Sequence, residues 1–265
     1  MENVKIITIN TWKCDGEYRV RMGILAKQLK QLKPHVIACQ ECFYSEEANA
    51  DTLKFLANEL NMNYSFLPGR SKKRLFEGRV VNSTSGLGIL SVYPLTETNS
   101  FDLPVVPEDN DRKAFSVNVN LPSGKTLTMT TTHLTHLGQH KGLRKAQAET
   151  LAGFVIEREP NPYHIICGDF NATPDSEAVM AFRELAKAAD CYTAGNGTEP
   201  HYSLTDAYYK ANKQVCIDHI FTLQLPDTDN YPQFIDSAVV LNVPDEASGL
   251  YPSDHFGIST TLITP

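Results

Sequence analysis

The sequence lacks any long run of apolar residues, and this absence excludes the simplest kind of membrane protein. No stretch approaches the roughly 20 apolar residues that a membrane-spanning helix requires. Residues 1–3 lead directly into the apolar run of residues 4–9, so no secretory leader is visible. We therefore expect a cytoplasmic protein without stable membrane insertion, although an exported chain whose leader had been removed would look the same.

The sequence also lacks a basic tail, an internal repeat, a low-complexity segment and a Pro/Gly-rich linker. Its formal net charge is −7. Nonspecific binding of nucleic acid depends on Lys and Arg contacts to phosphates. The composition therefore argues against a protein dedicated to nucleic acid, although a local basic patch could suffice. Candidate functional residues extend from Asn10 to His255, so we expect a single domain over residues 1–265.

The six cysteines raise a redox alternative, because residues 39–42 have the form Cys-x-x-Cys. Cys39 and Cys167 lie in apolar, strand-like runs, where a reduced thiol behaves as a small hydrophobic side chain. Cys39 ends such a run rather than opening a helix, which favours two free thiols over a redox pair. Reduced cysteines are typical of a cytoplasmic protein.

Apolar spacing predicts an α/β fold in which short strands alternate with amphipathic helices. In the middle of the chain several strands follow one another without helices, which indicates antiparallel sheet. The expected arrangement is a four-layer α/β/β/α sandwich of two packed sheets flanked by helices. The expected helices are 19–32, 46–60, 139–157 and 175–186, and the expected strands are 4–10, 36–39, 64–67, 87–92, 115–119, 127–132, 163–167, 216–223, 235–241 and 256–262.

The tetrapeptide Gly168-Asp169-Phe170-Asn171 follows the strand-like run 163–167. Side chains at the carboxyl end of such a strand lie at the sheet edge where α/β proteins hold their sites. On an extended segment, Asp169 and Asn171 would point the same way. One could orient or deprotonate a water while the other donates a hydrogen bond to a phosphate oxygen. The alternative is a simple turn, which Asp and Asn favour.

Oxygen ligands at other strand ends predict a magnesium site. Glu41 follows the buried run 36–39, and a buried charge is costly unless it is paired or binds an ion. Asn10 ends the first strand, and Asp254 could be a further ligand. Mg²⁺ prefers such hard oxygen ligands. Considered on its own, Glu41 could simply cap a loop, and Asn10 could be a turn residue. Zinc is disfavoured, because His133 and His136 have no clustered His or Cys partners.

Two histidines stand near acids at strand ends. His133 ends the run 127–132, and His255 follows Asp254. A histidine surrounded by carboxylates can be protonated at neutral pH, and it could then stabilise phosphoryl charge or protonate a leaving oxygen. Asp218 is the expected partner that raises such a histidine's proton affinity.

The densest basic run, residues 70–74, could meet a polyanionic substrate or could be a solvated loop. We expect substrate contacts from Arg70, Arg112 and Arg144. Lys113 and Gln147 are further candidates for phosphate or scaffold contacts.

Taken in order, these motifs resemble the endonuclease/exonuclease/phosphatase superfamily, whose members include deoxyribonuclease I, sphingomyelinases and inositol polyphosphate 5-phosphatases. The resemblance covers nearly the whole chain. The motifs are Asn10, Gln40-Glu41, Ser85-Gly86-Leu87-Gly88-Ile89-Leu90-Ser91, Thr132-His133, Arg144 with Gln147, Gly168-Asp169-Phe170-Asn171, Ile217-Asp218-His219-Ile220-Phe221 and Ser253-Asp254-His255.

The resemblance implies a deoxyribonuclease I-like sandwich and cleavage of a P–O bond that depends on Mg²⁺, with Mn²⁺ as an alternative ion. It also implies roles for single residues. Glu41 would be the main metal ligand with Asn10 near it, and Asp254 a metal-site acid. Asp169 would orient or deprotonate the water, and Asn171 would donate to the transition state. His255 would bind phosphate, oriented by Asp218, and His133 would be a further catalytic histidine.

The segment Asn10-Thr11-Trp12 is closest in form to the sphingomyelinase-like and tyrosyl-DNA phosphodiesterase-like branches. Two positions depart from the family pattern. His219 stands where Tyr is frequent, and Phe170 stands where tyrosyl-DNA phosphodiesterases have Thr.

The expected function is a phosphoesterase acting on a small molecule, a lipid headgroup or nucleic acid, with no protein partner implied. A nuclease is the first alternative, and a non-catalytic phosphate-binding module is the second. Retention of Glu41, Asp169 and His255 favours the enzyme.

Overall fold

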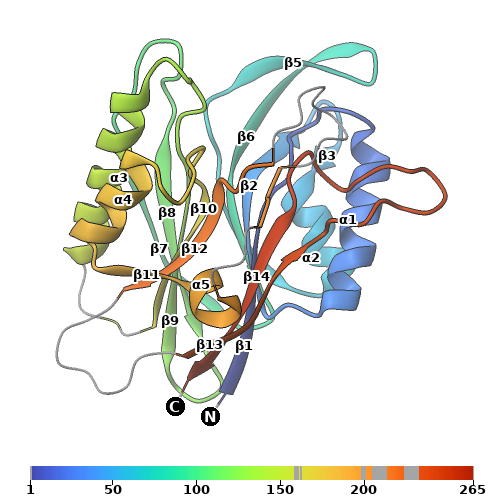
Figure 1. Ribbon diagram of the computed structural model, residues 1–265. Coiled ribbons are helices and arrows are strands. Elements are labelled where there is room, and N and C mark those ends of the chain that lie inside the picture. The colour runs from blue at the N-terminus through green and yellow to red at the C-terminus, as the bar shows by residue number, and fades with distance from the viewer. Residues whose placement is uncertain are drawn as a thin grey trace.

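The chain folds into two β-sheets packed face to face, with helices on both outer faces (Figure 1). The computed structural model describes residues 2–157, 161, 163–197, 201–204, 214–223 and 233–264. Helices α1 (Tyr18–Leu32) and α2 (Thr52–Leu60) cover the first sheet, and α3 (Lys141–Ile156) and α4 (Glu177–Leu185) cover the second. The expected four-layer α/β/β/α sandwich is confirmed.

The first sheet has the strand order β13-β14-β1-β2-β6-β4. Its strands β1 and β2 are parallel, and the other pairs are antiparallel. Two short strands extend it, since β3 pairs with β2 and β5 with β6. The bounds are β1 Glu2–Asn10, β2 Val36–Ser45, β3 Ala50–Asp51, β4 Asn63–Leu67, β5 Lys72–Phe76, β6 Arg79–Ser91, β13 Gln233–Val240 and β14 Gly257–Thr264.

The second sheet has the strand order β11-β12-β10-β9-β8-β7, with only the pair β9 and β10 parallel among its described strands. A short helix, α5 (Cys191–Asn196), follows β11. The bounds are β7 Leu95–Asp102, β8 Lys113–Asn120, β9 Thr126–His133, β10 His164–Asp169, β11 Ala188–Asp190 and β12 Asp218–Leu223.

Alternation along the strands produces three apolar layers. In β1, Val4 and Ile6 point between the sheets, while Ile7 and Ile9 point toward α1 and α2. A period of two sends successive side chains to opposite faces of a sheet, so a strand buried on both faces reads as a continuous apolar run. A third cluster, which includes Leu151 and Phe182, lies between the second sheet and α3 and α4.

The topology brings the candidate site residues to one end of the sandwich. Parallel β1 and β2 and parallel β9 and β10 direct their carboxyl ends there, so Asn10, His133 and Asp169 each stand at a strand terminus. Gly168 permits the close approach of β9 to β10. Its φ is +137°, and a Cβ atom there would lie 2.1 Å from the carbonyl oxygen of Thr132.

Several expected element bounds were wrong. The second helix begins at Thr52 rather than at residue 46, because residues 50–51 pair with β2 and the Asp51 carboxylate accepts a hydrogen bond from the amide of Lys54. Residues 72–76 form strand β5 rather than a loop. Strand β7 was not predicted, since its sequence is almost entirely polar and exposed.

Among the described residues, no helix has the length and apolar character needed to cross a membrane.

Candidate active site

A cavity of about 440 Å³ opens where the carboxyl ends of the strands meet. Nine of the eleven site residues expected from the sequence line it. Those nine are Asn10, Glu41, Arg70, Arg112, His133, Asp169, Asn171, Asp254 and His255. Asp218 lies directly behind His255, and Arg144 does not line the cavity.

The sequence predicts that Glu41 lies at the end of a strand. It lies instead in a β-bulge within β2. The register between β2 and β6 shifts between Cys39 and Cys42, and Glu41 has a φ of +57°. A bulge inserts an extra residue and re-aims its side chain. Here it directs the Glu41 carboxylate into the cavity.

Gln40, directly before Glu41, ties the two sheets together. Its amide nitrogen donates hydrogen bonds to the Thr8 hydroxyl of the first sheet, at 3.1 Å, and to the Thr131 hydroxyl of the second, at 2.9 Å. Gln40 is fully buried. These two hydrogen bonds fix the position of Glu41 relative to the residues of the second sheet.

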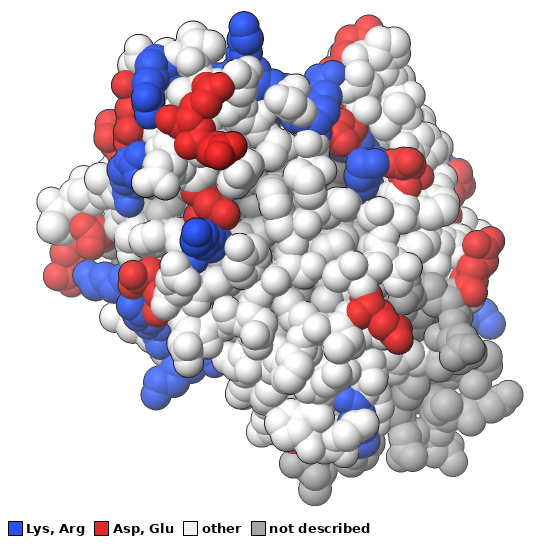
Figure 2. Space-filling model, turned by 180° about the vertical axis from the view of Figure 1, so that it is seen from behind, with Lys and Arg blue, Asp and Glu red and all other residues white. Residues whose placement is uncertain are grey.

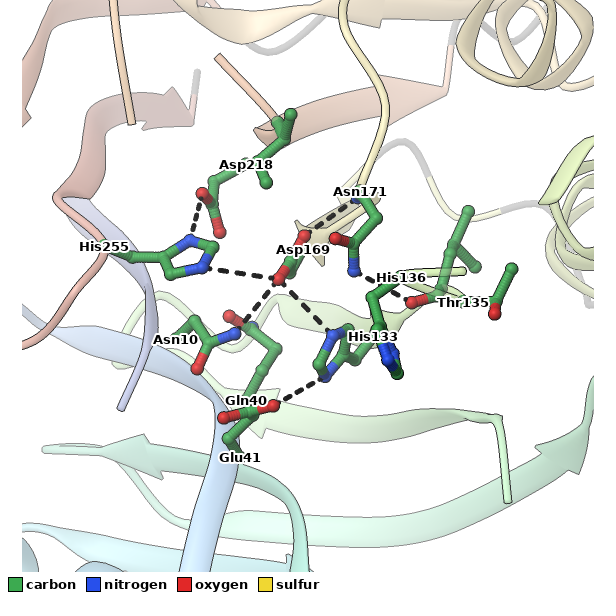
Figure 3. A network of polar contacts seen from close by, with 12 residues as sticks. Asn10, Gln40, Glu41, His133, Thr135, His136, Asp169, Asn171, Asp218 and His255 are labelled. Carbon is green, nitrogen blue, oxygen red and sulfur yellow. Dashed lines mark hydrogen bonds and ion pairs between the residues drawn. The ribbon is translucent and has the colours of Figure 1, made fainter. Parts of the chain in front are cut away.

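Asp169 is the buried centre of the polar network in Figure 3. Its Oδ2 accepts a hydrogen bond from the Asn10 amide at 3.0 Å and lies 3.4 Å from Nε2 of His133. The same oxygen lies 3.8 Å from Nε2 of His255. Burial, together with the charge of Asp218, raises the pKa of Asp169 to about 7. This carboxyl group can therefore exchange a proton near neutral pH.

Asn171 follows Asp169 in a turn, so the extended geometry expected from the sequence was wrong. Its φ is +50°, and its backbone amide donates to Oδ1 of Asp169 at 2.8 Å. The turn nevertheless keeps Asn171 on the cavity wall. Its side-chain amide donates to the carbonyl of Leu134 at 3.0 Å, which leaves one amide hydrogen for another acceptor.

His255 is held by Asp218, as the family resemblance implies. Nδ1 of His255 lies 2.8 Å from Oδ2 of Asp218, and both side chains are buried. Burial lowers the pKa of His255, but the charges of Asp218 and Asp169 outweigh this effect and raise the pKa to about 10. His255 is therefore an imidazolium at neutral pH, with its Nε2 directed toward Asp169.

His133 differs from His255 in its charge. Burial and the positive charges of Arg112 and His255 lower the pKa of His133 well below its ordinary value. The prediction that nearby acids keep a histidine protonated therefore holds for His255 and is wrong for His133. Neutral His133 lies between Asp169 and Glu41, with its Nδ1 3.9 Å from Oε1 of Glu41.

The oxygen atoms on the Glu41 side of the cavity fit a hard cation. The ammonium group of Lys13 already lies 3.1 Å from Oε2 of Glu41. Burial lowers the pKa of Lys13, but the charges of Glu41, Asp15 and Asp254 outweigh it and raise the pKa. A cation is therefore stabilised beside these carboxylates. Carboxylate oxygens with few nitrogen ligands suit Mg²⁺.

Asn10 makes contacts beyond the metal-site role expected from the sequence. Its Oδ1 accepts a hydrogen bond from the amide of Trp12 at 3.0 Å, and its nitrogen donates to Asp169. Asn10 therefore orients the Asp169 carboxylate. A second lone pair on its Oδ1 remains available to an ion.

A second cluster, Asp169, Asp218 and His255, places three ligand-type atoms within 4.8 Å of one another. The 2.8 Å contact between Asp218 and His255 is that of a charge-assisted hydrogen bond. A protonated imidazole cannot bind a metal. This cluster therefore holds a proton, and the Glu41 side holds the better metal ligands.

The three arginines expected to bind substrate have different surroundings. Arg112 donates to both carboxylate oxygens of Asp109 and to the carbonyl of His133, so it holds the cavity wall in place. Arg144 donates to the carbonyl of Thr135 outside the cavity. Only Arg70 lines the cavity without an ion pair to an acid of the described chain.

Arg21 is a buried residue of α1 that the sequence reasoning missed. The five N–H donors of its guanidinium group make six contacts of hydrogen-bond length, one of them shared, to the carbonyls of Thr11, Trp12, Lys13, Asp15 and Pro252. It thereby joins the loop after Asn10 to the loop before Asp254. One signal was present, because Arg21 lies four residues before buried Leu25 and thus on the same helix face.

Apolar spacing in residues 19–32 would place Val20 on the buried face of this helix, yet Val20 is 46% exposed. Lys13 was not among the site residues expected from the sequence, and no spacing in the sequence would have placed it there. It lies in a tight turn with φ of +38°.

The redox alternative is disfavoured by burial. Cys39 and Cys42 are free and essentially inaccessible. Burial raises the pKa of Cys42 well above its ordinary value, so its thiol stays protonated and unreactive.

Comparison with known proteins agrees with this geometry. The sequence model of the Endonuclease/Exonuclease/phosphatase family matches residues 7–255. No curated protein matches the sequence.

Among solved structures, similarity extends over the whole fold. The human Nocturnin catalytic domain with bound sulfate anion is 18% identical, with a TM-score of 0.75 over 99% of this chain and 95% of that one. A humanized D. rerio TDP2 is 20% identical, with a TM-score of 0.76 over 99% of both chains. The Bacteroides thetaiotaomicron mannosyl-6-phosphatase Bt3783 is 18% identical, with a TM-score of 0.70 over 98% of this chain and 99% of that one.

These identities alone show a shared fold, whereas the family match covers residues 7–255 and therefore every expected site motif. The chain therefore belongs to the Endonuclease/Exonuclease/phosphatase family, whose members are hydrolases that act on phosphoester bonds.

Proposed function

We propose that this protein is a Mg²⁺-dependent phosphoesterase that hydrolyses a P–O bond of a phosphodiester or phosphomonoester by in-line attack of water. The observation that carries the proposal is the pairing of two buried groups at one cavity. Asp169 has a pKa near 7, and the imidazolium of His255 lies 3.8 Å from it. A base and a positive charge at this spacing suit attack on a phosphoryl group.

Glu41 and Asp254 would hold the metal ion, with Asn10 beside them, and Mn²⁺ would serve as an alternative to Mg²⁺. When bound, the ion polarises the phosphoryl group and neutralises its charge. The remaining steps belong to side chains of the chain itself.

Asp169 orients the attacking water and accepts its proton at Oδ2. Asn10 and the backbone amide of Asn171 hold the carboxylate by one hydrogen bond to each oxygen. These contacts fix the direction of the lone pairs that face the water. Nε2 of neutral His133 lies 3.4 Å from Oδ2 of this carboxylate.

His255 donates from Nε2 to a phosphoryl oxygen, on which negative charge increases in the transition state. Asp218 keeps the ring protonated and fixes its orientation through Nδ1. The free amide hydrogen of Asn171 is the second donor to the same group. Preorganised donors of this kind favour the transition state over the ground state.

A phosphatase activity has a precedent on this fold, since one similar structure is named as a mannosyl-6-phosphatase.

All six cysteines are free thiols, which suits the reducing cytoplasm.

The proposal is tested by hydrolysis of bis-p-nitrophenyl phosphate and of plasmid DNA with Mg²⁺, with and without EDTA. Turnover that requires the metal is expected for at least one of them. Equal turnover in EDTA would contradict metal dependence.

Glu41→Gln should weaken metal binding by at least the roughly 10- to 100-fold that loss of an outer-shell partner costs, because it removes the carboxylate that the bulge directs at the ion. Calorimetric titration with Mn²⁺ measures this directly, without turnover. Glu46→Gln is the matched control, since Glu46 is an exposed acid that follows the same strand. Equal Mn²⁺ affinity in the two variants would place the metal elsewhere.

The pH dependence of kcat/KM should be bell-shaped. Activity rises as Asp169 loses its proton near pH 7 and falls as His255 loses its proton near pH 10. Asp218→Asn removes the charge that holds the proton on His255, so the alkaline limb should move to lower pH. An alkaline limb that stays in place would show that another group controls it.

A further inference from the structure

Strand β5 directs basic side chains into the same cavity as the catalytic centre. Lys72 and Arg74 are two residues apart on an extended strand, so their side chains share one face. Both line the cavity, together with Arg70 just before the strand. Lys73, between them, does not line it.

Arg74 is preorganised without being neutralised. Its guanidinium group donates to the hydroxyls of Ser83 and Ser85, each at 3.0 Å, and to the carbonyl of Ser83 at 3.4 Å. These acceptors are uncharged oxygens. The side chain is therefore held in place while its positive charge remains available.

The three cations also lack acidic partners. No ion pair joins Arg70, Lys72 or Arg74 to an acid in the part of the chain that the structure describes. Two acids that line the same cavity have other contacts, since Asp109 binds Arg112 and Asp111 accepts a hydrogen bond from the backbone amide of Arg70.

The pKa of Lys72 reflects the excess of positive charge among these side chains. Burial and the charges of Arg70, Arg74 and Arg112 lower its pKa, with only Asp109 acting in the opposite direction. An anion bound among these groups would relieve their mutual repulsion. Arginine and lysine in such an arrangement bind phosphate by charge-assisted hydrogen bonds.

We propose that Arg70, Lys72 and Arg74, here called the β5 cluster, form a second anion subsite, so that the substrate is a small phosphoester that carries another phosphate. This inference rests on the proposed function, because the catalytic centre takes the scissile phosphate. Both subsites belong to one cavity. The second phosphate then orients the substrate before attack.

Size and charge favour a small substrate over a nucleic acid strand. A cavity of about 440 Å³ lies in the range of small-molecule sites, roughly 300–1,000 Å³. A long polyanion would need an extended basic surface. On the face shown in Figure 2, Lys and Arg lie among Asp and Glu, mainly along its upper and left parts, and no continuous basic surface crosses it.

The test compares glucose 1,6-bisphosphate with glucose 6-phosphate, which differ by one phosphate. Binding is measured by calorimetry with Mg²⁺ in the Asp169→Asn background, where turnover is suppressed. The cluster variant is Lys72→Gln/Arg74→Gln. The control is Lys73→Gln/Lys54→Gln, which removes the same charge from exposed positions outside the cavity.

The cluster variant should bind the bisphosphate about tenfold or more weakly than the control, and should lose less affinity for the monophosphate. Equal bisphosphate affinity in the two variants would overturn the proposal. Equal losses for both sugars would also overturn it, because the cluster would then hold the first phosphate.

A DNA tetranucleotide is the third probe. If the cluster variant lost more affinity for it than for the bisphosphate, the subsite would serve a strand rather than a small molecule. The two proposals can fail independently, because binding tests the subsite and hydrolysis tests the proposed function. A retained bisphosphate preference without metal-dependent turnover would reject the proposed function alone, and turnover without the preference would reject the subsite alone.

Discussion

Asp169→Asn should lower kcat by about 10³- to 10⁴-fold, the upper part of the range for loss of a general base. The substitution keeps the shape of the side chain, and its carbonyl oxygen can still accept the hydrogen bond from the amide of Asn171. It removes the ability to take a proton from water. Turnover of bis-p-nitrophenyl phosphate with Mg²⁺ measures the change.

The folded state should survive this substitution. Asp169 is buried, and its raised pKa shows that the ionised form is disfavoured there, so a neutral amide should cost only the hydrogen bond from Asn10, about 1 kcal/mol. Asp175→Asn, an exposed change shortly after the same strand, is the control for activity. If Asp169→Asn kept more than a tenth of the activity, neutral His133 would be the better candidate for the base.

Arg21→Ala should lower the free energy of unfolding by about 4 kcal/mol or more. The loss of one buried guanidinium group leaves the carbonyls of two loops without their donor. Such groups are costly to bury unsatisfied. Urea unfolding measures the change.

Arg19→Ala is the matched control on the same helix. Arg19 is half-exposed and forms an ion pair with Glu77, so its loss should change stability by no more than about 1 kcal/mol. Arg21→Lys should restore only part of the stability, since an ammonium group lacks the planar fork of donors. A loss below 1 kcal/mol for Arg21→Ala would show that solvent satisfies these carbonyls.

The strand-end residues could be predicted from the sequence because two regularities coincide. Each motif follows a short apolar run, and parallel strands bring their carboxyl ends together. Asn10, His133 and Asp169 obey this rule. The same reasoning recovered the four layers, since the alternation of strands and helices leaves few packing solutions.

The local backbone at the site could not be predicted in the same way. The bulge at Glu41 and the turn at Asn171 both require positive φ at residues other than glycine. Such conformations are unfavourable locally and are stabilised by tertiary contacts. Arg112 and Arg144 have the composition of phosphate ligands, yet both donate hydrogen bonds to carbonyl oxygens of the protein, and Arg112 also donates to Asp109.

The site is divided between two sheets, with Glu41 and His255 attached to the first and His133 and Asp169 to the second. Their alignment therefore depends on the apolar layer between the sheets, which Gln40 crosses. Close-packed interiors have low compressibility and transmit strain, and a misplacement of about 1 Å can cost about 10²-fold in rate. Side-chain volume in that distant layer is thus a determinant of catalytic rate as well as of stability, and drift in sequence there is constrained by both.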